Sequence, residues 1–456
     1  MSYRNLEEAI TAAGSPVSLL RNSQMGPYVY PVVPPEFTNW RDEQRAWQQS
    51  VALFNQSFHM TDMYIEGPEA LKLLRDFGIN SFQNFGVNKA KQYVACNPDG
   101  YVIGDAVLFG LREDLFNLVG RPSAHNWIQY QCETGSYNAK CERDERSFVR
   151  TGPPVRKAYR FQVQGPSAPK LIEKLIGKSV PDIKFFNMGD FTIAGRTVAA
   201  LRHGMVGQPG WELYGPWAEG DEVKNAIIEA GKEFGLRQVG ARAYSSNTLE
   251  SGWIPSPLPA VYTNDKMKGY RQWLPGNGYE ATASLGGSFN SPNIADYYLT
   301  PNDIGYGSLA KFDHDFVGRE ALEKRAGTDR RKKITLVWNP EDATRAIGSL
   351  FHEGPGAKYV DFPSAVYSTL PYDKVLSGGK TAGVSTWSGY SFNERKMLSL
   401  AIVDEQFSAP GTPLTLVWGE EKSTRPTVEP HVQTEIRVTA APVPYGEVAR
   451  SAYRPK

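Results

Sequence analysis

Cysteine is scarce in this sequence, which has three in 456 residues: Cys96, Cys132 and Cys141. Their odd number and their spacing fit neither a disulfide framework nor a CxxC metal site. So few cysteines are typical of proteins from a reducing compartment, so we expect a cytoplasmic protein.

Long apolar runs and an excess of one charge are also missing. No run approaches the roughly 20 apolar residues that cross a bilayer. Glu7 and Glu8 stand where a secretion signal needs a positive start and an apolar block, so we expect a soluble protein without membrane contact. Lys and Arg total 50 against 49 for Asp and Glu, which gives no general attraction to nucleic acid.

Several catalytic signatures do not occur. The sequence contains no GxGxxG after a strand, no GxSxG and no HExxH, which disfavours dinucleotide-binding, serine-hydrolase and zinc-protease functions. Residues 374–381, KVLSGGKT, end as a P-loop does, but Lys374 replaces its first glycine, so we expect a hairpin turn. Asp313, His314 and Asp315 in FDHDF are neighbours that rarely converge on one ion, so we expect no metal.

The length and the mixed strand and helix patterns predict about three domains of the α+β class. Apolar runs flank the tetrapeptide Asn97-Pro98-Asp99-Gly100, which predicts a β-hairpin. A stretch rich in Gly, Pro, Asn and Tyr, residues 254–299, predicts an insertion between domains. From residue 332 short strands alternate with glycine and proline turns, which predicts an all-β end domain.

The polar stretch GARAYSSNTLESGW, residues 240–253, raises the question of a serine nucleophile. Such a serine needs a general base, and the sequence indicates none. Asn247 and Glu250 have the spacing of a capping box, so we expect a helix to begin at Asn247.

Five segments occur together in one order: YRFQVQGPSA, HGMVGQPGWELYGP, GARAYSSNTLESG, TPNDIGYGSLAKFDHDFVGREAL and GVSTWSGYSFNERKMLSLAIVDEQFSAPGT. In this order they resemble the aminomethyltransferase (T-protein) family of the glycine cleavage system, from about residue 45 to about residue 445. The segments QSFHM, NLVGRP and RAYSSNTLESGW resemble more closely the tetrahydrofolate-dependent aryl O-demethylases, which remove methyl groups from lignin-derived methoxybenzoates such as vanillate and syringate.

The resemblance implies a three-domain ring with folate in its central hole: two interleaved antiparallel α+β domains and a C-terminal β-barrel domain. The implied divisions are a folate-binding domain of residues 1–65 and 155–300, a ferredoxin-like domain of residues 66–154 that contributes to the aryl site, a connector of residues 301–331, and a barrel domain of residues 332–456.

The resemblance also implies an activity, the transfer of a methoxybenzoate methyl group to N5 of tetrahydrofolate. Syringate is the first expected substrate, and vanillate or 3-O-methylgallate the second. Two alternatives stay open: an aminomethyltransferase or dimethylglycine/sarcosine-type folate enzyme, and a non-enzymatic folate-binding protein of the same superfamily. Arg121 and the single acid Asp105, where the parent family has a pair, disfavour the first; no cysteine stands in a motif that would support the second.

For the aryl substrate, the resemblance implies five binding residues and one catalytic residue. Tyr244 is the expected catalytic residue, because its hydroxyl has a pKa near that of the phenol being released, roughly 10. Arg121 is expected to bind the benzoate carboxylate through both arms of its guanidinium group. The other expected substrate-binding residues are Tyr30, Gln56, Phe58 and His59. Tyr244 as an interdomain packing residue and Arg121 as a surface residue remain the alternatives.

For the folate, the resemblance implies Glu212, Trp253, Gln164 and Tyr214. A carboxylate such as Glu212 can accept two parallel N–H bonds from a pterin ring, and the flat face of Trp253 suits a flat cofactor. The role of Asp105 is left open.

Overall fold

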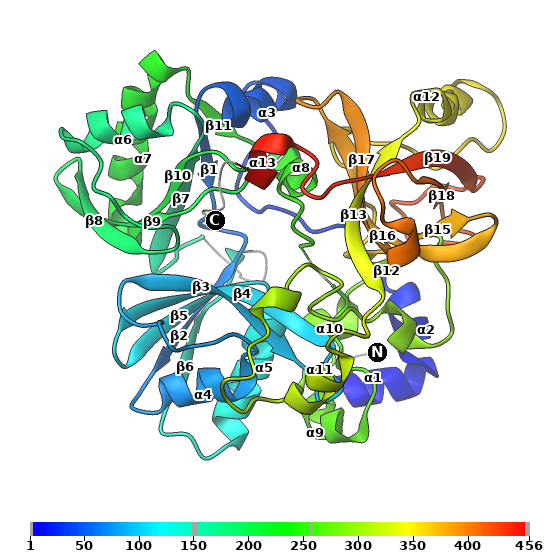
Figure 1. The fold of residues 1–456 in the computed structure, drawn as a ribbon, viewed down its shortest axis with the longest axis horizontal. Coiled ribbons are helices and arrows are strands. Elements are labelled where there is room, and N and C mark those ends of the chain that lie inside the picture. The colour runs from blue at the N-terminus through cyan, green and yellow to red at the C-terminus, as the bar shows by residue number, and fades with distance from the viewer. Residues whose placement is uncertain (1–2, 148–153, 256, 452–456) are drawn as a thin grey trace.

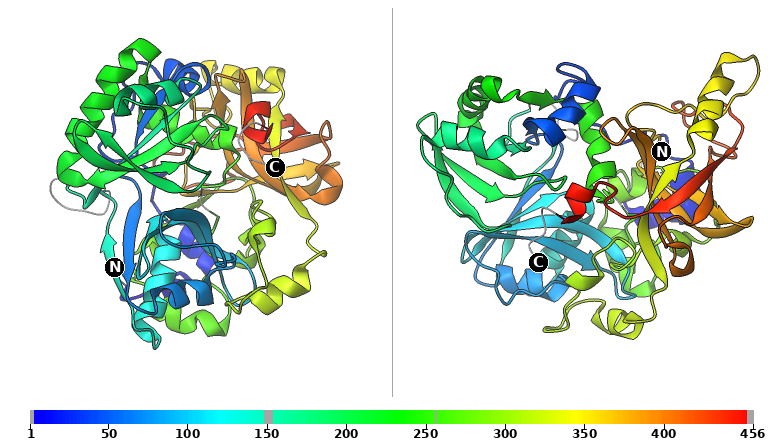
Figure 2. Two further views of the ribbon diagram at one scale, coloured as in Figure 1. Left: turned by 60° about the vertical axis from the view of Figure 1, so that its left-hand side comes forward. Right: turned by 45° about the horizontal axis from the view of Figure 1, so that its top comes forward.

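Two open sheets and one closed barrel form three lobes around a common centre (Figure 1; Figure 2). The structure, a computed structural model, describes residues 3–147, 154–255 and 257–451. Residues 148–153, at the end of the second predicted domain, lie outside this description. The predicted α+β arrangement with a C-terminal barrel is confirmed.

The first lobe is a six-stranded sheet covered by α6 (Ala168–Ile176) and α7 (Gly220–Gly231). Its strands are, in spatial order, β11 (Arg237–Val239), β1 (Ala52–Asn55), β7 (Ala158–Gln164), β10 (Gly210–Pro216), β9 (Arg196–Arg202) and β8 (Met188–Ile193). Only the β1–β11 pair is parallel; the other pairs are antiparallel. The core of this lobe lies between the sheet and the two helices.

The second lobe is a five-stranded antiparallel sheet with α4 (Ala70–Phe77) and α5 (Pro122–Thr134). Its strands are, in spatial order, β3 (Lys89–Cys96), β4 (Val102–Arg112), β5 (Leu115–Gly120), β2 (Thr61–Glu66) and β6 (Lys140–Asp144). The predicted hairpin is confirmed: the Asn97 side chain accepts the N–H groups of Asp99 and Tyr101 between β3 and β4. Because β2 belongs to this sheet, we propose that the first domain boundary lies before residue 61.

The third lobe is a closed barrel of six strands, as the sequence predicts. Its strands are, in order around the barrel, β13 (Arg331–Trp338), β17 (Lys396–Asp404), β16 (Lys380–Ser391), β15 (Asp373–Ser377), β18 (Pro413–Trp418) and β19 (Thr434–Ala441). The turn between β15 and β16 is Gly378-Gly379, with φ of 55° and 78°. KVLSGGKT is therefore a hairpin, because the left-handed conformation of both residues favours glycine.

The segment between residues 254 and 299 does not form a separate unit. It carries α9 (Lys268–Trp273), α10 (Tyr279–Thr282) and β12 (Leu285–Gly286), and β12 pairs with β14 (Leu370–Pro371) from the end domain. Most of its buried apolar residues share one core with the second sheet and with α1 (Leu6–Ala13) and α2 (Pro16–Arg21). The segment thus ties the second lobe to the barrel. Three further helices are α11 (Arg319–Arg325), α12 (Pro340–Gly348) and α13 (Glu447–Ser451).

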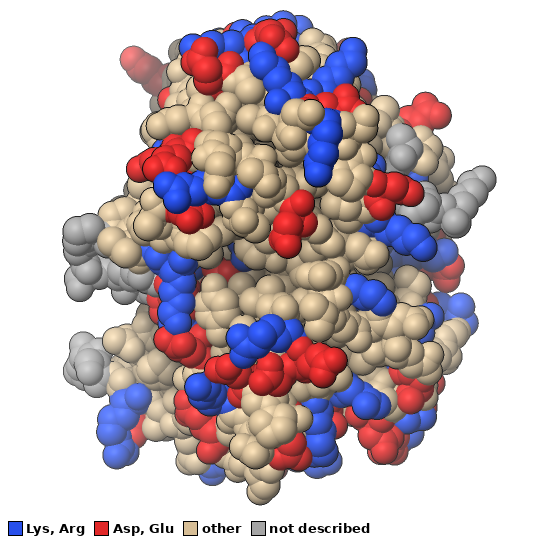
Figure 3. All heavy atoms as spheres, turned by 90° about the vertical axis from the view of Figure 1, so that its left-hand side faces the viewer, with Lys and Arg blue, Asp and Glu red and all other residues tan. Residues whose placement is uncertain are grey.

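Acidic and basic side chains are interspersed over the face formed by the first and second lobes (Figure 3), as the balanced composition leads us to expect. Among the described residues, no helix is long and apolar enough to cross a membrane.

Helix α8 (Ala241–Ser251) lies between the first lobe and the barrel, and the predicted start at Asn247 is wrong (Figure 1). The helix begins six residues earlier because Gly240 is its N-cap and the Gly240 N–H donates to the buried Glu43 carboxylate at 2.9 Å. A side chain at residue 240 would clash with the carbonyl of Pro35, so this position requires glycine. The N–H of the N-cap is thus bound by a carboxylate from α3 (Trp40–Gln49), which no local spacing reveals.

Glu250, near the end of α8, holds three elements together. Its buried carboxylate accepts hydrogen bonds from Trp47 Nε1 at 2.7 Å and Gln48 in α3. It also accepts from Ser391 Oγ at 2.7 Å and Asn393 beside the barrel. Glu250 is therefore a fixed joint between the first lobe, α8 and the barrel.

Replacing Glu250 by alanine should destabilise the fold. The change leaves several buried donors without an acceptor, and each costs about 1–3 kcal/mol. We expect Glu250→Ala to lower the thermal midpoint by at least about 5 °C in a calorimetric scan. Glu250→Gln, which keeps the shape and one acceptor oxygen, should lose less. An Ala variant as stable as the parent would contradict the role of Glu250 in linking the first lobe, α8 and the barrel.

Candidate functional site

A cavity of about 330 Å³ lies where the two open sheets meet α8. Its walls come from the β1–β2 connection, β4, the start of α5, β10 and α8. Seven of the ten residues that the sequence predicts for the site line this cavity: Tyr30, Gln56, His59, Arg121, Glu212, Tyr244 and Trp253. Side chains distant in the sequence are thus brought to one place.

The hydroxyl of Tyr244 is held by two side chains. Gln56 Nε2 donates to its oxygen at 2.7 Å, and His59 Nε2 lies 3.2 Å from it. Burial raises the pKa of Tyr244 well above its ordinary value, and the nearby Tyr30 raises it further. Tyr244 therefore keeps its proton at neutral pH.

His59 is uncharged in this setting. Burial and the neighbouring Arg121 lower its pKa to about 3. Its Nδ1 is buried without a hydrogen-bond partner among the described residues. We assign the proton to Nε2, because an orphaned buried N–H is rarer than an orphaned acceptor. The oxygen of Tyr244 then receives two donors, and its own O–H is left to point into the cavity.

Tyr30 forms an aromatic wall of the same cavity. Its ring centroid lies 4.6 Å from that of Tyr244 and 4.8 Å from that of His59. Burial raises the pKa of Tyr30 above its ordinary value, so it too stays protonated. The site therefore offers neutral polar groups against an aromatic surface.

Arg121 is the N-cap of α5 and lines the cavity, so it is not a surface residue remote from the site. Its guanidinium carbon lies 4.2 Å from the ring centroid of Tyr28. Tyr28 also lines the cavity, and its hydroxyl donates to the carbonyl oxygen of His59. Tyr28 is not among the residues predicted from the sequence, although it stands two residues before Tyr30 and alternate residues of an extended segment face the same side.

Glu212 faces the cavity from β10 and is paired with Arg160 of β7, which the sequence analysis also missed. Arg160 makes a second ion pair with Asp62 at 2.9 Å, and its guanidinium lies 5.0 Å from the ring centroids of Phe109 and Tyr214. Burial alone would lower the pKa of Arg160, but the two carboxylates raise it above its ordinary value. Arg160 thus fixes one oxygen of Glu212.

Asp105 lies in the cavity wall next to Trp253. Its carboxylate accepts from Trp253 Nε1 at 3.2 Å, Gln92 Nε2 at 2.7 Å and Tyr306 at 3.0 Å. Burial raises the pKa of Asp105, and the bonds from Trp253 and Tyr306 counteract this. Trp253 is 40% exposed, so one part of its ring faces solvent.

Three predicted residues lie outside this cavity. Phe58 turns away from Gln56 and His59 and packs edge-on against Trp217, with centroids 5.6 Å apart. Gln164 accepts the N–H of Met205 at 2.9 Å, and the Tyr214 hydroxyl donates to the sulfur of Met188. Their direct contact with a ligand stays a prediction. Asn247, which does not cap α8, instead lines the cavity.

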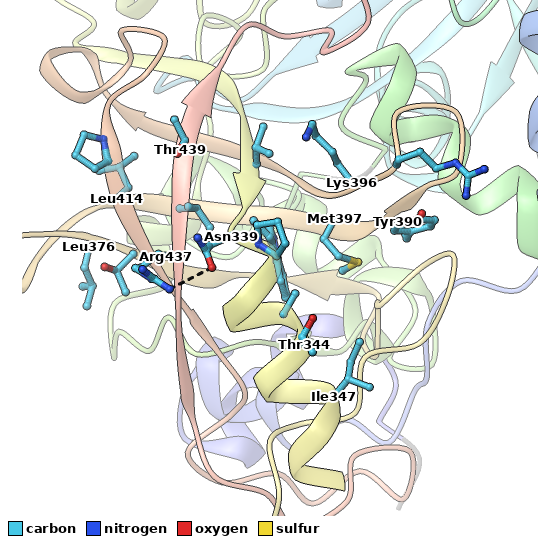
Figure 4. A pocket seen from close by; sticks show the side chains of 18 of the residues that line it. Asn339, Thr344, Ile347, Leu376, Tyr390, Lys396, Met397, Leu414, Arg437 and Thr439 are labelled. Carbon is cyan, nitrogen blue, oxygen red and sulfur yellow. Dashed lines mark hydrogen bonds between the residues drawn. The ribbon is translucent and has the colours of Figure 1, made fainter. Parts of the chain in front are cut away.

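A larger cavity, about 660 Å³, lies on the barrel beside α12 (Figure 4). None of the ten predicted site residues lines it. Its Arg437 is engaged with Asp342 at 2.8 Å and with Asn339 at 3.2 Å, the latter drawn in the figure. The volume of a cavity alone therefore does not identify the functional site.

The FDHDF residues also have protein partners. His314 contacts Asp313 at 2.8 Å and the carbonyl of Gly78 at 3.0 Å, and Asp315 pairs with Arg319. The described residues contain no group of three or more His, Cys, Asp or Glu side chains that could hold a metal ion.

The family model described as the GCVT N-terminal domain matches residues 20–256. A syringate O-demethylase from Sphingobium sp. (strain NBRC 103272 / SYK-6) is 53% identical over 452 residues, which are 99% of this chain and 98% of that protein. A sesamin methylene transferase from Sinomonas sp. (strain No.22) is 32% identical over 408 residues, 86% of this chain and 85% of that protein.

Among solved structures, the aminomethyltransferase T of the glycine cleavage system from Bartonella henselae has a similar fold. The TM-score is 0.60, with 15% identity over 92% of both chains. Together with the match to the family model and the two relatives, this shows that the chain belongs to the GCVT (glycine cleavage T-protein) family.

Proposed function

We propose that the protein is a tetrahydrofolate-dependent aryl O-demethylase, which moves the methyl group of a methoxybenzoate to N5 of tetrahydrofolate. The main support is the 53% identity to a syringate O-demethylase over 99% of the chain. The cavity adds a chemical argument, because the phenol of Tyr244, the guanidinium group of Arg121 and the buried carboxylate of Glu212 all line it. Syringate is the first proposed substrate, and vanillate or 3-O-methylgallate the second.

The cavity residues fit a folate. Glu212 presents a carboxylate to the cavity, and a pterin carries adjacent N–H groups that pair with one. Phe109, Phe186 and Trp253 add apolar and aromatic surface around it. When bound, tetrahydrofolate supplies the nucleophilic N5 that accepts the methyl group. Arg160 keeps Glu212 in one orientation and balances its buried charge.

Tyr244 assists the departure of the phenolate. Gln56 and His59 donate to its oxygen, so its O–H is directed at the ether oxygen that becomes negative. Burial raises the pKa of Tyr244, and the same burial acts on the leaving phenolate, so the two oxygens stay close in proton affinity. Arg121 holds the carboxylate at the other end of the ring, and Tyr30 packs against the ring face.

The aminomethyltransferase alternative is supported only by more distant members of the family, such as one from Streptomyces avermitilis at 26% identity.

The three cysteines are free thiols. This fits the cytoplasmic location that we propose. A link to lignin-derived aromatic compounds follows from the proposed substrates.

The direct test is an incubation with tetrahydrofolate and a panel of methoxybenzoates, with 5-methyltetrahydrofolate measured by mass spectrometry. We expect it to form with syringate or vanillate. Formation of methylenetetrahydrofolate from an amine donor, with no product from any methoxybenzoate, would reverse the proposal.

Tyr244→Phe should abolish most turnover. The ring packing is kept, and only the donor to the departing oxygen is removed, an effect of about 10²–10⁴ in kcat for acid catalysis. The KM for the methoxybenzoate should change less than about threefold in steady-state assays. Near-normal kcat would show that Tyr244 only packs between the lobes.

Glu212→Gln should weaken folate binding. The variant is nearly isosteric but loses the charge that strengthens two hydrogen bonds, and we expect the KM for tetrahydrofolate to rise about 10- to 100-fold. The KM for the methoxybenzoate serves as the internal control and should stay within about threefold. If the folate KM is unaffected, the assignment of Glu212 is wrong.

Arg121→Met should raise the KM for the methoxybenzoate about 10- to 100-fold, because the carboxylate loses a charged, two-armed partner. The matching methoxybenzyl alcohol, which has no carboxylate, is the control substrate. Its kinetics should respond little to the substitution. An equal effect on both compounds would point to a general distortion and against carboxylate binding.

A further inference from the structure

A second cavity, of about 560 Å³, adjoins the reaction cavity. It is lined by residues 25–29, by the first half of α5, by residues on and after β6, and by the α9–α10 region. Tyr28 lines both cavities. The two also meet at the start of α5, where Arg121 faces the reaction cavity and the next residue, Pro122, lines the second one.

Tyr28 forms a wall between the two cavities. Its hydroxyl donates to the carbonyl oxygen of His59, which fixes it on the reaction side. The guanidinium carbons of Arg121 and Arg146 lie 4.2 Å and 5.2 Å from its ring centroid, and Arg146 lines the second cavity. The Tyr28 side chain is thus held by one hydrogen bond, by two cation–π contacts and by an edge-on contact with the ring of Tyr30, whose centroid lies 5.7 Å away.

The boundary between the cavities is positively charged. Arg121 and Arg146 flank Tyr28 there. Arg143, which lines the second cavity, pairs with Glu145 at 2.6 Å. The N-terminus of α5, a helix of 13 residues, adds its positive end. This charge favours a small anion.

Both oxygens of the buried Glu280 accept from the side chain of Asn126, which lines the second cavity, at 3.0 Å. Trp273 and Tyr279 give the second cavity an aromatic lining. Cationic and aromatic groups together suit an aromatic carboxylate.

We propose that this second cavity is an access site through which the aromatic acid reaches, and its phenolic product leaves, the reaction cavity. The acid first binds near Arg143 and Arg146, and then passes Tyr28 to Arg121 when the Tyr28 ring turns aside. This inference rests on the proposed function, because it concerns the same aromatic acid. It adds a binding site and a route.

The test narrows the second cavity without touching the reaction cavity. Gln129 lines only the former, in the middle of α5, where its side chain bonds to Glu133 and Arg143. Gln129→Trp fills the route, and Gln129→Ala, which loses the same bonds without added bulk, is the matched control. Association and dissociation of syringate are followed by stopped-flow tryptophan fluorescence with the full-length protein and no folate, and the Kd is measured by calorimetry.

A blocked route slows both directions and leaves the equilibrium unchanged. We expect Gln129→Trp to lower the association and dissociation rate constants at least about tenfold, with a Kd within about threefold of that of the parent. In Gln129→Ala both rate constants and the Kd should stay within about twofold of the parent values. Equal association and dissociation rate constants in the two variants would overturn the route. A weaker affinity of Gln129→Trp for syringate, without slower dissociation, would also overturn it. If the parent binds and demethylates syringate, either result removes only the route; if it binds no methoxybenzoate, the proposed function fails too.

Tyr28→Phe tests the wall independently. The ring and both cation–π contacts remain, but the bond to the His59 carbonyl is lost, so the ring should turn more easily. We expect both rate constants to rise about two- to fivefold. Rates that stay unchanged in this variant would show that Tyr28 is not the wall that the acid passes.

Discussion

The buried contact between Gln56, His59 and the oxygen of Tyr244 is the interaction on which the site depends. It joins α8 to the β1–β2 connection, two segments separated by more than 180 residues. With the His59 proton assigned to Nε2, two donors reach the phenolic oxygen and its own proton is left for the cavity. Burial raises the pKa of Tyr244, which keeps that proton in place at neutral pH. Everything that fixes α8 and the connection therefore acts on the chemistry.

Both segments are fixed by buried polar groups. On the α8 side, Glu43 caps the first turn and Glu250 holds the last turn to α3 and the barrel. On the other side, the Arg160 N–H donates to Ser57 Oγ, and its carbonyl accepts the Gln56 N–H at 2.9 Å. The side chain of Arg160 meanwhile holds Glu212. One residue of β7 thus supports the proposed aryl end and the proposed folate end of the cavity.

The sequence predicted much of the architecture because its signals are local. Hairpins at residues 97–100 and 378–379 follow from glycine, proline and asparagine turn chemistry, and an all-β end domain follows from short strands between such turns. Its closure into a barrel is what the family resemblance implies. The start of α8 was mispredicted because its cap comes from Glu43, nearly 200 residues away. Arg160 was missed for the same reason: an arginine inside a strand shows its partners only when β7 and β10 pair.

The motifs of the family resemblance contain most of the predicted residues that line the cavity. Tyr244, Glu212 and Arg121 reach the cavity from three different elements, whereas Phe58 shares the motif of His59 but points elsewhere. Resemblance identifies a segment, and the local backbone decides which of its side chains faces a ligand. Tyr28 illustrates the converse, since its importance depends on two arginines that the sequence places far from it.

The central claim is that the O–H of Tyr244 stabilises the departing phenolate. The most direct measurement uses single-turnover assays of a series of ring-substituted methoxybenzoates, with the parent and with Tyr244→Phe. The logarithm of the rate constant for methyl transfer is plotted against the pKa of the leaving phenol, and the two slopes are compared. The account predicts a shallow slope in the parent and a steep one in the variant, because only the parent supplies a donor to a poor leaving group. Equal slopes in the two proteins would contradict it.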